Sequence, residues 1–198
     1  MPRRTAADAA VTRRTILDAA RATFAEDGYQ AATLDGIALR AGVTRGAVHH
    51  HFGDKHELFV EVFEEVEREI NDAVVEAALT ATPIGLEPFK AGCRMLFEQF
   101  ARPDLRRIVL ADAPAVLGLV AWYEIDRGFG LATIRAGLQS LAADGALDHE
   151  DAEALALLLY GALTEASLAL GAGLTTVDEA AIIDTVDRIL RAFAPAAR

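Results

Sequence analysis

The chain has 198 residues, of which 53% are hydrophobic and 25% charged, with a formal net charge of −11. This apolar content is ample for a buried core, and a single cysteine, Cys93, excludes an intramolecular disulfide and favours a reducing cytoplasm. The N-terminus lacks an apolar signal segment, and Asp112 and Glu165 interrupt the long apolar runs before the ~18 residues that a membrane span needs. We therefore expect a cytoplasmic protein without a membrane partner.

The negative charge is concentrated in the second part of the chain. Residues 1–60 carry a net charge of +1, and residues 61–198 carry −12. Charges in solution are screened over about 8 Å at physiological salt, so an acidic second part is compatible with a first part that binds a polyanion.

The first residues, 1–10, lack periodicity and predict a disordered tail. A helix is predicted over about 11–27, and Gly28 is expected to end it. The apolar face of this helix consists of Ile16, Leu17, Ala20 and Phe24.

The segment from Thr33 to Lys55, TLDGIALRAGVTRGAVHHHFGDK, predicts two short helices joined by a tight turn. Gly42 allows the positive φ that ends the first helix, and Val48 is spaced to fill the gap between the helices. Thr33 and Thr44 each precede a helix, where a hydroxyl caps free amides. An ordinary helical hairpin with a polar outer face is the alternative to a helix-turn-helix.

The outer face of the second helix carries donors and small residues. A helix fits the major groove of B-DNA, its N-terminal residues reach base edges, and neighbouring amides and Lys55 hold phosphates. The residues of this face are Arg45, Gly46, Ala47, His49, His50 and His51.

A capping box from Asp54 to Glu57 predicts a long helix over about 55–80. Its apolar stripe contains Leu58, Val62, Val66 and Ile70, with Phe59 and Phe63 alongside. The acidic side chains expected to face water are Glu61, Glu64, Glu65, Glu67 and Glu69. Five further helices are predicted over about 84–101, 103–111, 115–143, 149–171 and 177–193, so the fold class is all-α with about nine helices.

Two of these helices are more apolar than one chain's core requires. Pairing them with their copies in a second chain gives a four-helix interface with C2 symmetry. The residues expected at this homodimer interface are Leu155, Leu159, Ala162, Leu163, Ala166, Ile182, Val186 and Leu190.

Aromatic residues of the helical body are candidates for lining an effector cavity, although helical spacing of aromatics is also typical of a core. The candidate ligand-binding residues are Phe97, Phe100, Trp122, Tyr123, Phe129, Tyr160 and Thr164.

Catalysis has little support in the sequence, and we expect neither an enzyme nor a cofactor. His149 with Glu150 and Asp151 reads as a helix start, and Cys93 reads as an inert buried thiol. The alternating histidines point to different sides of a helix, so no metal site is expected.

The segment from Thr12 to Glu61 closely resembles the N-terminal DNA-binding domain of the TetR family of bacterial transcriptional regulators. The resemblance is carried by ILDAA, F-x-E-x-GY, T-x-x-x-IA, AGV-[ST]-[RK]-G, HF and K-x-x-L. It implies a three-helix DNA-binding domain over 1–54, followed by a helical effector-binding and dimerisation domain over 55–198. The residues that it places in the groove are Arg45, Ala47, His49 and His50, with Thr33, Thr44 and Lys55 on the phosphate backbone.

One departure from the family pattern concerns positions 49 and 50, which are usually aromatic and here are both His. Imidazole must then make contacts that a phenol would make, which predicts pH-dependent strength near neutrality.

The resemblance implies a dimeric repressor that binds a near-palindromic operator, with recognition helices about 34–36 Å apart. A small-molecule effector would release it by favouring a conformation in which the 55–80 helices splay. The alternatives are an all-α ligand-binding or enzymatic dimer without sequence-specific DNA binding, and a DNA-binding protein that has no ligand.

Overall fold

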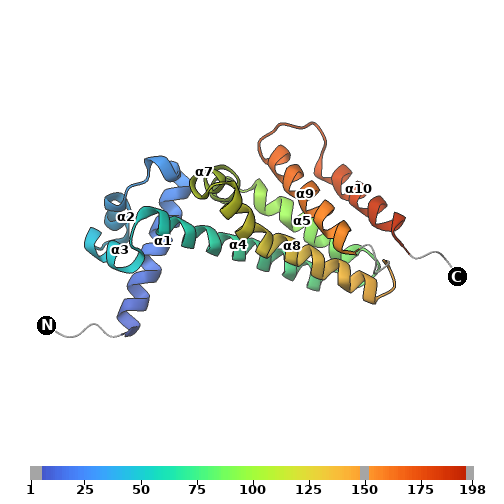
Figure 1. Ribbon diagram of the computed structural model, residues 1–198, viewed down its shortest axis with the longest axis horizontal. Coiled ribbons are helices and arrows are strands. Elements are labelled where there is room, and N and C mark those ends of the chain that lie inside the picture. The colour runs from blue at the N-terminus through green and yellow to red at the C-terminus, as the bar shows by residue number, and fades with distance from the viewer. Residues whose placement is uncertain (1–5, 148–151, 195–198) are drawn as a thin grey trace. The chain divides into compact units, whose positions relative to one another are not determined.

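The computed structural model describes residues 6–147 and 152–194, and every regular element in these residues is helical (Figure 1). This confirms the predicted all-α class. The α-helices are α1 (Ala6–Ala31), α2 (Leu34–Ala41), α3 (Arg45–Phe52), α4 (Lys55–Thr80), α5 (Glu87–Ala101), α6 (Pro103–Arg106), α7 (Ala113–Leu117), α8 (Leu119–Ala143), α9 (Ala152–Gly171) and α10 (Glu179–Ala192). A π-helical segment, Arg107–Asp112, lies between α6 and α7.

The chain forms two compact units. Unit 1 comprises residues 1–66 and 107–122, and unit 2 comprises residues 67–106 and 123–198. The chain therefore passes between the units within α4, between α6 and the π-helical segment, and within α8. The expected functional division into 1–54 and 55–198 stays a prediction.

In unit 1, α1 to α3 and the first turns of α4 enclose a small apolar core. Phe24, Phe59 and Phe63 are fully buried in it, and the rings of Phe24 and Phe59 meet edge to face with centroids 5.1 Å apart. Gly28 interrupts α1 with φ 80° and ψ 164°, which agrees with its predicted role as a stop. The helix nevertheless begins at Ala6, so the prediction of a disordered tail over residues 1–10 was wrong for residues 6–10.

Residues 107–122 return to unit 1 and pack on the end of α1. The Arg107 guanidinium donates to the carbonyls of Glu26 and Asp27 at 3.0 and 3.1 Å. Asp112 accepts from the backbone N–H of Tyr29 at 2.8 Å. Because a cation at a helix C-terminus satisfies free carbonyls, Arg107 caps the main body of α1 where Gly28 ends it.

Two predicted helices of the body are divided in the structure. The predicted helix 103–111 is α6 followed by the π-helical segment, and the predicted helix 115–143 is broken at Gly118, where φ is 78° and ψ is 153°. This backbone conformation is accessible to glycine and strained for other residues, so Gly118 separates α7 from α8.

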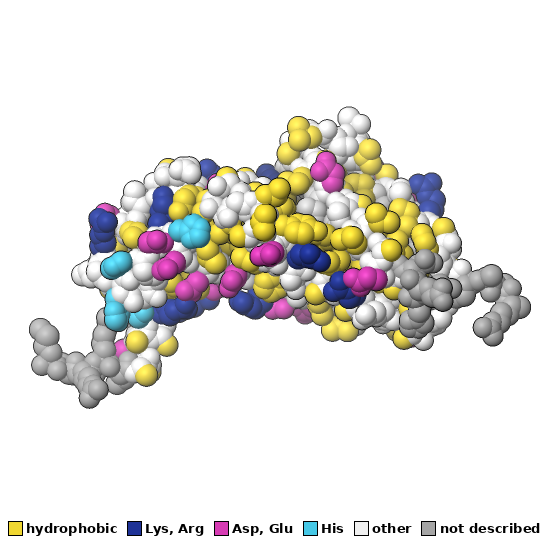
Figure 2. Space-filling model, viewed as in Figure 1, with side chains coloured by type: hydrophobic (Ala, Val, Ile, Leu, Met, Phe, Trp, Pro, Cys, Tyr) yellow, Lys and Arg dark blue, Asp and Glu magenta, His cyan; other side chains and the backbone are white. Residues whose placement is uncertain are grey.

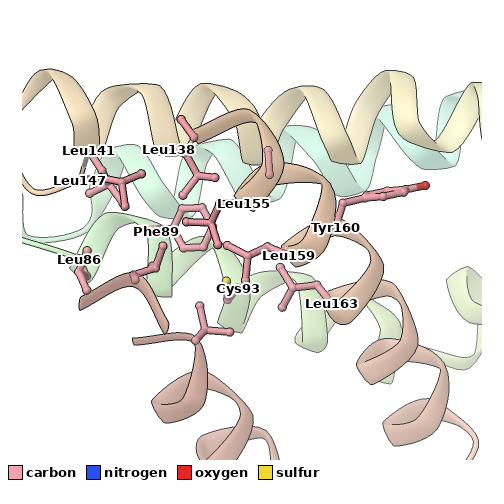
Figure 3. Packing of buried hydrophobic residues seen from close by; sticks show 14 of the residues in the cluster. Leu86, Phe89, Cys93, Leu138, Leu141, Leu147, Leu155, Leu159, Tyr160 and Leu163 are labelled. Carbon is pink, nitrogen blue, oxygen red and sulfur yellow. The ribbon is translucent and has the colours of Figure 1, made fainter. Parts of the chain in front are cut away.

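Unit 2 is built around one apolar cluster contributed by α5, α8, α9 and α10 (Figure 3). Phe89 and Cys93 of α5 face Leu155 and Leu159 of α9 in this cluster. Burial raises the pKa of the Cys93 thiol to about 12, which suits an inert core residue.

Helix α9 is long and apolar enough, by length and composition alone, to cross a membrane. Glu153 and Glu165 lie within this helix, and an apolar core helix meets the same criterion. One face of α9, with Leu155, Leu159 and Leu163, is buried in the unit 2 cluster. The predicted helix start at 149 lies outside the described residues, as do His149, Glu150 and Asp151.

Candidate nucleic-acid interface

Both helices of the predicted hairpin begin at a threonine cap. The hydroxyl of Thr33 accepts from the N–H of Gly36 at 3.1 Å, and that of Thr44 accepts from the N–H of Ala47 at 3.2 Å. Both threonines are exposed. Because each hydroxyl oxygen accepts from an amide, its own hydrogen is left to donate outward.

The turn between α2 and α3 has the geometry that the sequence predicts. Gly42 adopts φ 66° and ψ 29°, and the N–H of Val43 donates to the carbonyl of Ala38 at 3.0 Å. Val48 is 1% exposed and fills the space between the helices. The hairpin is therefore fixed by a left-handed cap and one buried plug.

The outer face of α3 presents Arg45, Gly46, His49 and His50 to solvent, with Ala47 half-buried. Arg45 pairs with Asp35 of α2 at 2.9 Å, and both side chains are 66% exposed. Sequence reasoning missed Asp35, because no periodicity links residues ten positions apart on different helices. An exposed pair of this kind is weak, so the guanidinium is readily released to another acceptor.

The histidines occupy the C-terminal half of α3. Nδ1 of His49 donates to the carbonyl of Gly53, the residue that ends the helix with φ 71°. The rings of His50 and His51 meet edge to face with centroids 5.4 Å apart. Histidine side chains consequently gather over α3 and the start of α4 (Figure 2).

Lys55 is engaged inside unit 1. Its ammonium donates to the carbonyls of Tyr29 and Ala32 at 2.9 and 3.0 Å and lies 4.2 Å from the centroid of the Tyr29 ring. An ammonium has three N–H donors, so these two bonds leave one for an outside acceptor. Lys55 thus ties the start of α4 to the end of α1.

Two arginines of α1 form ion pairs with glutamates of α4. Arg14 makes a bidentate contact with Glu65 of α4, with both N–O distances at 2.7 Å. Arg13 pairs with Glu61 and lies 4.7 Å from the centroid of the Phe52 ring. These ion pairs hold α1 and α4 together, and Phe52, at the buried end of α3, packs against Arg13 of α1.

The candidate ligand-binding residues do not form one group. Phe97 and Phe100 line a cavity of about 250 Å³ in unit 2, together with Arg106, Ser167, Leu170 and Glu179. Trp122 belongs to unit 1, where its indole N–H donates to the carbonyl of Val109 at 3.1 Å. Tyr123, Phe129, Tyr160 and Thr164 are not among the lining residues of this cavity.

Most of the residues expected at the dimer interface are core residues of a single chain. The fully buried ones are Leu155, Leu159, Leu163, Val186 and Leu190, while Ala166 and Ile182 are half-buried. The five buried residues are occupied within one chain and Ala162 is exposed, while the dimer interface itself stays a prediction. The exposed apolar residues of α9 are Ala154, Leu157, Leu158, Gly161 and Ala162.

Comparison with known proteins assigns both parts of the chain. The family model "Bacterial regulatory proteins, tetR family" matches residues 16–62, and "Tetracyclin repressor-like, C-terminal domain" matches residues 86–193. A TetR-family transcriptional regulator from Pectobacterium atrosepticum has the same fold with a TM-score of 0.79, at 33% identity over 98% of this chain and 100% of that one.

Curated relatives match mainly through the first part of the chain. The HTH-type transcriptional repressor BepR of Brucella suis is 36% identical over 107 residues, which are 54% of this chain and 51% of BepR. The HTH-type transcriptional regulator AcrR of Shigella flexneri is 43% identical over 76 residues, 38% of this chain and 35% of AcrR. The chain thus spans about half the length of BepR and a third of AcrR.

The capped hairpin of unit 1, the helical body of unit 2 and these matches over both parts lead to one assignment: the chain belongs to the TetR family of bacterial transcriptional regulators.

Proposed function

We propose that this regulator is a homodimeric repressor that binds a near-palindromic operator and leaves it when a small molecule binds unit 2. The observation that carries the proposal is the N-terminal half of α3, a capped helix start whose outward side chains are exposed. As a member of its family, the chain is a DNA-binding regulator and not an enzyme.

The hairpin supports separate roles for its residues. Arg45 releases Asp35 and hydrogen-bonds to a base edge. Gly46 and Ala47 are small enough to let the helix approach the groove floor. The hydroxyl hydrogens of Thr33 and Thr44 and the remaining N–H of Lys55 donate to phosphates. His49 and His50 lie further along the same exposed face.

The exposed apolar residues of α9 support a dimer that uses a different face of this helix from the one first predicted. Leu157 and Leu158 are 50% and 68% exposed, and Gly161 and Ala162 follow one turn later. On α10, Ala181 and Ile189 are also exposed. Small residues between large ones allow two copies of α9 to pack closely about a two-fold axis.

The experiment that tests the proposal is selection of bound duplexes from a random DNA library at two salt concentrations, with wild-type protein and Arg45→Ala. We expect a near-palindrome with half-sites one helical turn apart, and binding that weakens as salt rises. Arg45→Ala should bind the selected duplex ~10- to 100-fold more weakly and remain dimeric. If no sequence is enriched at either salt concentration, the proposal fails and an all-α ligand-binding dimer takes its place.

A further inference from the structure

Two buried carboxyl groups meet inside unit 2, on helices that are far apart in sequence. Glu67 of α4 is 4% exposed and Asp126 of α8 is 8% exposed, and their side chains are hydrogen-bonded to each other. Tyr160 of α9 donates its hydroxyl to Oδ2 of Asp126. The expectation that Glu67 faces water was therefore wrong, because Asp126 and Tyr160 enclose it.

A hydrogen bond between two carboxyl groups requires a proton on one of them, so Glu67 and Asp126 share a proton. Burial raises the pKa of both carboxyls, and the neighbouring Asp126 raises the pKa of Glu67 further. Hydrogen bonds from Tyr160 and Glu67 act in the opposite direction on Asp126 and favour its charged form. The hydrogen bond between the carboxyls is therefore made with Glu67 as the donor, and Asp126 accepts from both Glu67 and the Tyr160 hydroxyl.

One atom of this cluster is left over. Oε1 of Glu67 is buried and has no hydrogen-bond partner among the described residues. The ionisable groups that act on Glu67, Asp126 and Tyr160 are one another and Tyr123. Arg127 lies 5.4 Å from the centroid of the Tyr123 ring. Within residues 6–147 and 152–194, the cluster therefore presents a buried acceptor without a donor, and no cationic group is among those that act on it.

We propose that the Glu67–Asp126 pair binds the protonated amine of a small apolar effector. The inference rests on the proposed ligand response and names the class of ligand. A primary or secondary ammonium supplies the positive charge for Asp126 and an N–H donor for Oε1 of Glu67. A quaternary ammonium lacks the donor, and an alcohol lacks the charge.

The surroundings of the pair are suited to the apolar part of such a molecule. The Tyr160 and Tyr123 rings meet edge to face with centroids 5.9 Å apart. Tyr160 belongs to the apolar cluster of unit 2, and its hydroxyl points away from the labelled leucines (Figure 3). Ser167, two turns further along α9, lines the cavity with Phe97, about 10 Å from Tyr160 at 1.5 Å per residue. On this proposal the apolar body of the ligand extends along α9 toward this cavity, which the pair itself does not line.

The test uses the full-length protein with hexylamine, hexyltrimethylammonium and hexanol at pH 7.5. We expect hexylamine to bind at least about tenfold more tightly than the other two by calorimetry, since it alone combines charge and donor. It should also raise the midpoint of thermal unfolding. Equal affinities for hexylamine and hexanol would overturn the proposal.

Two isosteric variants separate the roles of the carboxyls. Asp126→Asn removes the charge and should weaken hexylamine binding about ten- to a hundredfold. Glu67→Gln keeps a neutral group with a donor and an acceptor, so its affinity should stay within about threefold of wild type. The control is Asp72→Asn, at an exposed position of α4 in the same unit. Wild-type affinity in Asp126→Asn would remove the carboxylate from the site.

Hexylamine binding tests the proposed amine site, and duplex binding tests the proposed repressor. Binding of the selected duplex without any preference for hexylamine would refute the amine site and leave the proposed repressor intact. Hexylamine binding that leaves the duplex bound would refute its role as an effector. The inference is supported if Asp126→Asn no longer binds hexylamine and if hexylamine releases the wild-type protein from the duplex.

Discussion

Replacing Lys55 by Met removes an ammonium that joins the end of α1 to the start of α4. The ammonium donates to two carbonyls at 2.9 and 3.0 Å and lies 4.2 Å from the centroid of the Tyr29 ring. Each charged hydrogen bond contributes about 1.5 kcal/mol at the lower end of its range, and the contact with the ring adds about 0.5–1 kcal/mol. Methionine keeps most of the aliphatic stem. We therefore expect Lys55→Met to lower the free energy of unfolding by roughly 3.5–4 kcal/mol.

Urea denaturation at fixed protein concentration measures this loss, because the stability of a dimer depends on concentration. The control is Arg40→Met in the same unit, where the Arg40–Glu26 pair is exposed and a much smaller loss is expected. If Lys55 also contacts a phosphate, the variant's slope of log K against log salt falls by about 0.9 per chain. A stability loss below about 0.5 kcal/mol would show that the two carbonyl contacts do not brace unit 1.

Three further predictions concern the dimer face, the end of α1 and the buried acid. Leu158→Glu should raise the dimer dissociation constant more than ~100-fold in sedimentation experiments, since two copies lose apolar burial, whereas Leu174→Glu, 81% exposed and beyond α9, should leave the dimer intact. Gly28→Ala should destabilise the protein by roughly 1–3 kcal/mol in urea, because φ is +80° and the new Cβ would lie 2.7 Å from Nη2 of Arg107; Gly46→Ala, in the open part of α3, should be neutral or stabilising. The pKa of Glu67 is raised in the folded state above its ordinary value of 4.5. At a pH above 4.5 the unfolded chain therefore binds fewer protons than the folded one, and the free energy of unfolding falls as pH rises. Glu67→Gln should flatten this decline between pH 5 and 8, and equal slopes in the variant and the wild type would contradict the raised pKa.

Local signals in the sequence were sufficient for the hairpin and the long helix. Asp54, whose carboxylate accepts from the N–H of Glu57 at 2.8 Å, sets the start of α4, and the predicted range 55–80 agrees with Lys55–Thr80. Gly42 ends α2 because it can adopt the left-handed conformation that reverses the chain, and a second apolar set follows from Val43. Caps and turns depend on residues within a few positions of one another, so a single sequence contains their causes.

Features that depend on distant residues were not predictable in the same way. Gly118 breaks a helix, whereas Gly128, Gly130 and Gly137 continue inside α8, and the sequence offers no local difference that separates them. Helix α9 is apolar on nearly all sides, so its pattern does not say which face enters the core. In sequence Glu67 resembles the neighbouring glutamates of α4, which are half-buried, until Asp126, 59 positions later, is placed beside it.

The three places where the chain passes between its units connect the proposed effector site to the DNA-binding helices. Glu67 is the first residue of unit 2 within α4, and Tyr123 is the first within α8. Arg106 lines the cavity, and the next residue, Arg107, caps α1. Glu67, Tyr123 and Arg106 thus each lie one peptide bond from unit 1, so the proposed ligand contacts are adjacent in sequence to unit 1 at each passage. Because a ligand shifts an equilibrium only through different affinities for its two states, we expect these passages to be where the free and DNA-bound conformations differ.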